Sequence, residues 1–221
     1  MKPDQIIRTR RKTIALIIKP DGSLVVRAPL RASGRQIQQL IEQKLPWIEA
    51  TQERVRRSYP KITPKEYVNG EGFLYLGKSY RLAISPGARR PLALEGQFLL
   101  SPAAVPEARE TFINWYRLQA RQILNERVAW YAARYSFRYA RIKITSAHTR
   151  WGSYSSKGTL SFTWRLVMAP LEIIDYVVLQ ELAHTLEPNH GKAFWEKVKA
   201  IVPDYKQRIA WLKINGATLD I

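Results

Sequence analysis

The segment that most constrains the fold runs from residue 173 to residue 190. Apolar residues at helical spacing in Ile173–Leu179 lead into the run Gln180-Glu181-Leu182-Ala183-His184. This pattern predicts a buried helix. Side chains four residues apart lie on one helix face, about 5–6 Å from each other, so residues 180 and 184 should lie side by side. Glu187-Pro188-Asn189 should end the helix, because proline cannot continue it.

The same segment contains most of a zinc-binding motif. In H-E-x-x-H helices both histidines bind zinc, and the glutamate acts on the water that the metal holds. Here Gln180 occupies the first histidine position, Glu181 and His184 keep the other two, and His190 follows the expected turn. Three protein ligands would leave a fourth position open for water. The alternative is that His184 and His190 are ordinary polar residues on a surface helix, because E-x-x-H alone often arises by chance.

The residues before this helix carry a wider pattern. They are Arg150-Trp151-Gly152-Ser153, Gly158-Thr159-Leu160-Ser161-Phe162, Trp164-Arg165-Leu166 and Met168-Ala169-Pro170. Together with the helix and Phe194-Trp195, this order resembles the YgjP-like family of zinc metallopeptidases, which are related to SprT-type proteins. Members of that family read T-R-W-G-S-C-S, G-x-L-x-F-x-W-R-L, V-V-x-H-E-L-A-H and N-H-x-x-x-F-W. A weaker likeness near the start extends the resemblance to essentially the whole chain.

The resemblance implies a site for a zinc ion. In that site His184 and His190 are metal ligands, Glu181 is the general base, and residue 180 is the remaining ligand. Gln180 departs from the family's histidine, and its neutral carbonyl oxygen is a weaker donor than imidazole. We therefore expect metal affinity or activity to fall by at least about 10- to 100-fold, the cost of losing a partner of a zinc ligand. Tyr154 replaces a family cysteine, which we interpret as a packing change.

Further side chains could take part in this chemistry. His148 and Glu187 could replace the missing ligand. Arg150 and Arg165 could stabilise negative charge that develops during hydrolysis; the alternative for Arg150 is an ion pair that holds its loop. The alternation in residues 160–166 predicts a strand, and in zincin folds a substrate chain lies along an edge strand beside the metal.

Three functions remain open at this point. The first is a zinc-dependent hydrolase of the metallopeptidase type that acts on protein or peptide substrates and is weakened by Gln180. The second is a metal-dependent hydrolase of nucleotide phosphoanhydrides, which could use the same zinc, glutamate and arginines. The third is a catalytically silent, basic module that binds nucleic acid on the same scaffold.

The charge of the chain points to a polyanion as a possible partner. The chain has 36 Lys and Arg against 18 Asp and Glu, a net charge of +18. Residues 1–65 hold 15 basic and 5 acidic residues, which gives a net +10 of that total. The densest clusters are Arg8-Thr9-Arg10-Arg11-Lys12 and Arg54-Val55-Arg56-Arg57. We expect Arg8, Arg10, Arg11 and Lys12 to contact nucleic acid or another polyanion; the alternative is a solvated charged face.

Composition limits the other possibilities. The chain has no cysteine, so disulfides and thiolate metal sites are excluded, and a metal must use histidine and oxygen ligands. The start lacks the apolar core of a signal peptide, and no apolar run approaches the roughly 20 residues of a membrane span. We therefore expect a cytoplasmic protein that does not enter the membrane.

These patterns predict an α+β protein with two lobes. We expect an N-terminal β-rich lobe with a helical arm at residues 1–100, and a zincin-like metallopeptidase lobe at residues 101–221. The first should contain strands at 13–19 and 24–28 around a turn at 20–23, a helix capped by Ser33, and a linker at 59–64. The second should contain strands at 142–144 and 160–166 and helices at 106–135, 171–186, 192–201 and 205–212. We interpret the aromatic residues of the first of these helices as core.

Overall fold

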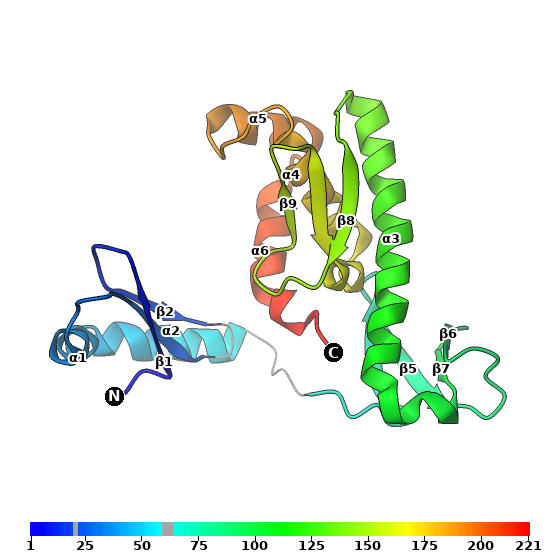
Figure 1. Cartoon of the computed structure of the whole chain (residues 1–221), viewed down its shortest axis with the longest axis horizontal. Helices are drawn as coiled ribbons and strands as arrows, with labels where there is room; N and C mark the ends of the chain where they lie inside the picture. Colours follow the sequence, from blue (N-terminus) through cyan, green and yellow to red (C-terminus); the bar gives the residue numbers. More distant parts are fainter. Residues whose placement is uncertain (20–21, 59–63) are drawn as a thin grey trace. The chain divides into compact units, whose positions relative to one another are not determined.

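The computed structural model describes residues 1–19, 22–58 and 64–221. The chain forms two compact units, one of residues 1–63 with 214–218 and one of residues 64–213 with 219–221. The mixture of helices and small sheets confirms the α+β class (Figure 1). The turn expected at residues 20–23 lies partly outside the described residues, and the linker expected at 59–64 lies almost wholly outside them.

The first unit is a three-stranded sheet with two helices. Its elements are β1 (Gln5–Thr9), β2 (Ala15–Ile18), β3 (Leu24–Pro29), α1 (Gly34–Gln43) and α2 (Leu45–Ser58). The strand order is β1-β3-β2, with β1 parallel and β2 antiparallel to β3. Alternate residues of β3 face the helices, so its apolar side chains form a small core with those of α1 and α2. That core consists of Leu24, Val26, Ala28, Ile37, Ile41 and Ile48.

The beginning of α1 matches the sequence expectation. The side chain of Ser33 accepts a hydrogen bond from the backbone N–H of Gln36, and the side chain of Gln36 accepts one from the backbone N–H of Ser33. This capping box satisfies two backbone donors at the start of the helix. Strands β2 and β3 also lie where the sequence predicted them, whereas β1 was not predicted.

The second unit contains two further sheets and four long helices. Its strands are β4 (Gly72–Tyr75), β5 (Lys78–Ile84), β6 (Leu92–Leu94), β7 (Phe98–Leu100), β8 (Arg141–Thr145), β9 (Gly152–Tyr154) and β10 (Thr159–Thr163). Its helices are α3 (Ala108–Tyr135), α4 (Leu171–Ala183), α5 (Lys192–Ile201) and α6 (Tyr205–Asn215), with short 3₁₀ helices η1 (Pro102–Glu107) and η2 (Trp164–Met168). The 3₁₀ helix η3 (Gly216–Thr218) belongs to the first unit. The sheet orders are β4-β5-β7-β6 and β8-β10-β9.

Helix α3 runs along the length of the second unit (Figure 1). One side of it buries Phe112, Tyr116, Leu124 and Val128, which confirms that Phe112 and Tyr116 belong to the core, whereas Trp130 near the end of the helix is exposed. The same core includes residues of β4–β7 and of α4. Residues 72–100 therefore pack with the C-terminal helices, and the compact units divide at residue 63, whereas we expected a lobe boundary near residue 100.

Helix α4 is fixed at its beginning by the hairpin of β4 and β5. The backbone N–H groups of Leu76 and Gly77 donate to the carbonyl oxygens of Val167 and Met168, at 2.8 and 3.0 Å. Gly77 has a φ of +78°, and a Cβ atom there would lie 2.7 Å from Cγ of Pro170, the residue before α4. The turn and the start of the helix can approach this closely because Gly77 has no side chain.

A buried ion pair joins α4 to α3. Arg127 donates from Nε to Oδ1 of Asp175 at 2.6 Å and from Nη2 to Oδ2 at 2.8 Å. Hydrogen bonding to Asp175 is the main reason that the pKa of Arg127 is raised. Such a two-pronged arrangement fixes orientation as well as distance.

We predict that Asp175→Asn lowers the free energy of unfolding by about 2–4 kcal/mol, because it leaves a partly buried guanidinium without its counter-charge. Urea unfolding would measure this loss. The matched control is Asp204→Asn, which removes the partner of Arg208 in a more exposed i,i+4 pair and should cost less than about 1 kcal/mol. Equal costs for the two substitutions would contradict the prediction.

Candidate active site

The predicted metal ligands and the predicted base surround one cavity of about 540 Å³. Strand β9 forms one wall, and the end of α4 with the loop after it forms the other. The lining residues are Gly152, Ser153, Tyr154, Ser156, Gln180, Glu181, His184, Pro188 and His190. The structure thus brings together the four residues of the candidate metal site, Gln180, Glu181, His184 and His190.

The two histidines point at each other. The Nε2 atoms of His184 and His190 lie 2.8 Å apart, and the rings stack with centroids 4.6 Å apart. The Nδ1 atom of His184 lies 3.1 Å from the carbonyl oxygen of Glu187. Because a carbonyl can only accept, Nδ1 carries the proton and Nε2 keeps its lone pair. This arrangement is how a second partner commonly orients a metal-binding histidine.

A buried aromatic ring supports both imidazoles. The ring of Phe194 in α5 lies 4.6 Å from the centroids of both His184 and His190. Burial, with a smaller contribution from the neighbouring His184, lowers the pKa of His190. Histidine binds metal in its neutral form, so this shift favours metal binding.

The Nε2 atoms of His184 and His190 are close enough to bind one metal ion together, but the third ligand would be a weak donor. Within residues 1–19, 22–58 and 64–221, no cluster of three or more His, Asp or Glu side chains is suited to a metal. The remaining candidate donor on the cavity wall is the half-buried Gln180, which lies on the same face of α4 as His184. A metal in this cavity would therefore have to use two imidazoles and an amide oxygen.

Glu181 follows Gln180 in the last turn of α4 and is a buried residue in the wall of the same cavity. Only 5 % of its surface is exposed. Burial raises the pKa of its carboxyl group to about 7, while the charge of Arg150 and a hydrogen bond from the backbone N–H of Tyr154 oppose the rise. A carboxyl group with this pKa can hold or release a proton near neutral pH.

Strand β9 lies directly against this carboxylate. A Cβ atom at Gly152 would lie 2.5 Å from Cγ and 2.7 Å from Oε1 of Glu181. The absence of a side chain at residue 152 therefore allows β9 to cover Glu181 and to direct the N–H of Tyr154 at it. Our sequence reasoning missed this role of Gly152 and assigned Tyr154 to packing alone. The sequence feature that could have indicated this role is the glycine within the run Arg150-Trp151-Gly152-Ser153.

The edge strand of this sheet also differs from the expectation. The predicted strand at 160–166 corresponds to β10, which is shorter and lies in the centre of the sheet. Strand β9, which we did not predict, forms the edge beside the cavity. Helix α4 ends at Ala183 with His184 as its cap, three residues before the predicted end at residue 186.

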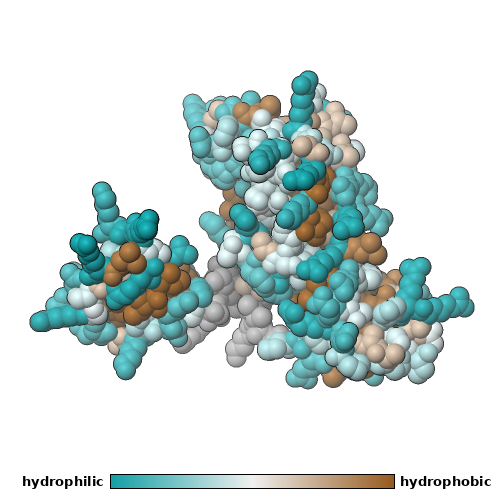
Figure 2. All heavy atoms as spheres, in the orientation of Figure 1, coloured by the Kyte–Doolittle hydropathy of each residue, from teal (hydrophilic) through white to brown (hydrophobic). Residues whose placement is uncertain are grey.

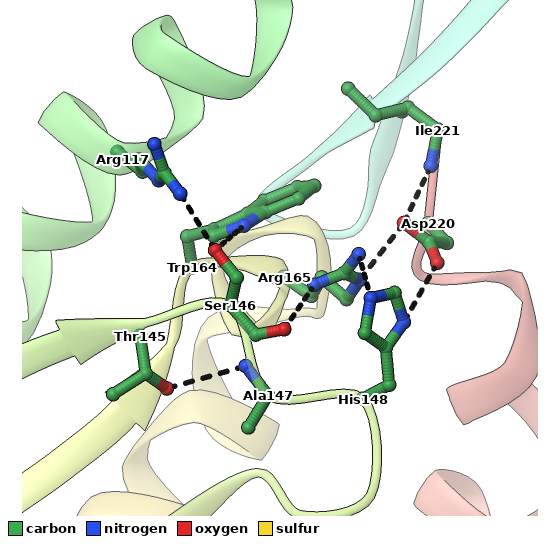
Figure 3. Close-up of polar contacts among 9 residues, drawn as sticks. All are labelled: Arg117, Thr145, Ser146, Ala147, His148, Trp164, Arg165, Asp220 and Ile221. Carbon is green, nitrogen blue, oxygen red and sulfur yellow. Dashed lines mark hydrogen bonds and ion pairs between the residues drawn. The ribbon is translucent and has the colours of Figure 1, made fainter. Parts of the chain in front are cut away.

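Arg165 and His148 belong to a separate polar network (Figure 3). Arg165 is 5 % exposed, donates to Asp220 at 2.9 Å and to the carbonyl oxygen of Ser146 at 3.2 Å, and lies over the ring of Trp164. His148 lies between Arg165 (3.0 Å) and Asp220 (3.4 Å). Neither side chain lines the cavity. The expectation that they could stabilise charge or replace a ligand is therefore wrong in this structure.

The other two candidate residues, Glu187 and Arg150, do not line the cavity but interact with residues that do. Glu187 contributes its carbonyl oxygen to His184, while its carboxylate lies 3.9 Å from Nζ of Lys197. Arg150 is exposed and is not a lining residue, although its charge acts on Glu181. Its participation in catalysis stays a prediction.

A comparison with models of protein families shows which family the chain belongs to. The family model described as YgjP-like, metallopeptidase domain, matches residues 12–215 of the chain. The chain belongs to the YgjP-like family. Neither a search of curated proteins nor a search of solved structures gave a match. Among the described residues of this YgjP-like chain, no helix is long and apolar enough to cross a membrane.

In this YgjP-like site we predict that Gly152→Ala lowers the free energy of unfolding by about 1–3 kcal/mol, because the added methyl group overlaps the side chain of Glu181. In a Glu181→Ala background the same change should cost much less, since the overlapping atoms are gone. Urea unfolding of the four proteins in this cycle would measure the coupling.

The control is Gly87→Ala, where a Cβ atom would make only an ordinary contact at 3.8 Å with Ser85. It should cost clearly less than Gly152→Ala. An unchanged cost of Gly152→Ala after removal of the Glu181 side chain would show that the contact does not determine the effect.

Proposed function

We propose that the protein is a zinc-dependent hydrolase of the metallopeptidase type that acts on protein or peptide substrates and is weakened by Gln180. The observation that carries the proposal is the convergence of the Nε2 atoms of His184 and His190 beside the buried carboxylate of Glu181. Membership in a metallopeptidase family supports the same class of reaction.

In this proposal His184, His190 and the carbonyl oxygen of Gln180 hold the metal. A zinc ion bound there supplies a Lewis acid that polarises a carbonyl group and makes water more acidic. The hydrogen bond from His184 to the backbone of Glu187 fixes which nitrogen of the ring can bind. The stacked ring of Phe194 holds both imidazoles in place.

Glu181 is the proton acceptor in this proposal. Its burial raises its pKa to about 7, so it can take a proton from water at neutral pH and return it to a leaving amine. Gly152 lets β9 lie over the carboxylate, which keeps bulk water away from one side of it. The cation of Arg150 is placed to favour the charged form of this base.

The edge position of β9 supports an extended peptide as substrate. Among the described strands, β9 is paired only with β10, so the main-chain groups on its other edge are unpaired in the sheet, apart from the N–H of Tyr154, which donates to Glu181. Adding a strand to an open edge is a common way to bind an extended peptide. The substrate would then run beside the cavity that contains Glu181.

We predict that Gln180→His raises zinc affinity at least about tenfold, because imidazole is a stronger donor than an amide oxygen. Titration of metal-free protein against a competing chelator would measure it. Gln207→His, the same change at an exposed residue of α6, serves as the control and should have no effect. If neither the original chain nor Gln180→His bound zinc, the proposed site would be wrong.

We also predict that the zinc-loaded Gln180→His protein cleaves unfolded casein, and that a further Glu181→Gln change slows cleavage about 100-fold or more. Glu172→Gln, which changes an exposed carboxylate in the first turn of the same helix, should leave the rate unchanged.

Release of phosphate or pyrophosphate from nucleoside triphosphates, with the same dependence on Glu181 and without cleavage of casein, would instead support the nucleotide hydrolase. Neither activity in a zinc-loaded protein would support the silent module.

A further inference from the structure

The topology of the first unit gathers its cations at one end of the sheet. Strands β1 and β3 are parallel and β2 is antiparallel to them, so the ends of β1 and β3 meet the beginning of β2. The loop at residues 10–14 and the loop at residues 30–33 both leave from this end. We call this end, with its exposed side chains Arg10, Lys12, Arg27, Arg31 and Arg35, the basic end.

The basic end has no acidic counterpart. Residues 5–19 and 24–41 contain no aspartate or glutamate. Of the acidic residues that the structure describes in this part of the chain, Asp4 bonds to Leu24 at the opposite end of the sheet, Glu42 accepts a hydrogen bond from Gln38 near the end of α1, and Glu49 and Glu53 are in α2. Among described residues, no ion pair involves any of the five cations of the basic end. Hydrophilic side chains project from this unit in Figure 2.

Arg8 has a different role from its neighbours. Its Nη1 atom donates to the carbonyl oxygens of Pro29, Leu30 and Ala32, at 3.2, 3.3 and 2.6 Å. Arg8 therefore holds the loop between β3 and α1, and through that loop it positions Arg31. These bonds give Arg8 a positioning role, and its expected contact with a polyanion stays a prediction.

A hollow opens at the basic end. Its volume is about 910 Å³, and its wall includes Lys12, Arg31, Gln36, Gln39 and Gln43. The wall contains two cations, three amides and no carboxylate. Amide groups donate hydrogen bonds to phosphate and sugar oxygens, and lysine and arginine neutralise phosphate charge.

We infer that the basic end binds the phosphate backbone of nucleic acid without reading its sequence, through Arg10, Lys12, Arg31 and Arg35 with the amides of the hollow. Two cations in the wall of the hollow and further cations on the same end of the sheet match the closely spaced charges of a nucleic-acid strand. An anionic membrane fits less well, because Leu30 is the one large apolar side chain that the described loops at this end expose strongly. This inference does not depend on the metal or on hydrolysis.

The test is fluorescence anisotropy of the full chain with labelled 20-nucleotide single-stranded and 20-base-pair duplex DNA of random sequence, over a range of salt. The test variant is Arg10→Gln/Lys12→Gln/Arg31→Gln. The matched control is Lys2→Gln/Lys19→Gln/Lys44→Gln, which removes the same charge from exposed positions outside the basic end. Thermal unfolding verifies that both variants fold.

We expect the test variant to bind about tenfold or more weakly, and the slope of log affinity against log salt to fall by about two to three, since three phosphate contacts are lost. The control should change affinity by less than about threefold, and Glu181→Gln should leave the affinity for DNA unchanged. Equal losses in the test variant and the control would overturn the inference, because they would reflect net charge alone. Absence of DNA binding, or binding to anionic vesicles of phosphatidylserine in its place, would also overturn it.

Discussion

The contact between β9 and the last turns of α4 determines the environment of the whole candidate site. Because residue 152 has no side chain, the strand lies against the carboxylate of Glu181 and shields it from water. The shielding raises the pKa of that group toward neutrality, and the neighbouring backbone N–H and Arg150 limit the rise. The same strand forms a wall of the cavity into which His184 and His190 point. The packing of β9 against Glu181 therefore affects both the wall of the cavity and the pKa of the carboxyl group.

Much of the fold could be predicted from the sequence, because the helices carry strong periodic signals. Helices α3 and α4 carry apolar residues along ten or more positions, and the buried face of α3 lies where its spacing placed it. Short strands were harder. Strand β9 is a three-residue Gly-Ser-Tyr run that forms because it pairs with β10, and β1 is a largely exposed five-residue segment that forms because it pairs with β3. Neither pairing can be recognised from the sequence of the strand itself.

The candidate site was predictable in part for the same reason. The positions of Gln180, Glu181 and His184 follow from one helix and its spacing, and the turn brings His190 back to His184. The supporting residues come from elsewhere in the chain: Gly152 from a strand, Phe194 from the next helix, and the carbonyl of Glu187 from the loop. The roles of Arg165 and His148 were misjudged because their partner, Asp220, lies more than 50 residues away in sequence.

The overlap that a side chain at residue 152 would cause also restricts the order in which this sequence can change. While residue 181 carries a long side chain, any replacement of glycine at 152 must displace it, so a substitution there is harmful from the start. Once residue 181 has become small, that restriction is lifted and residue 152 can vary. A descendant that had abandoned this chemistry would therefore be free to lose the glycine second. In this chain Gly152 and Glu181 are both present, so their contact is intact beside the amide of Gln180.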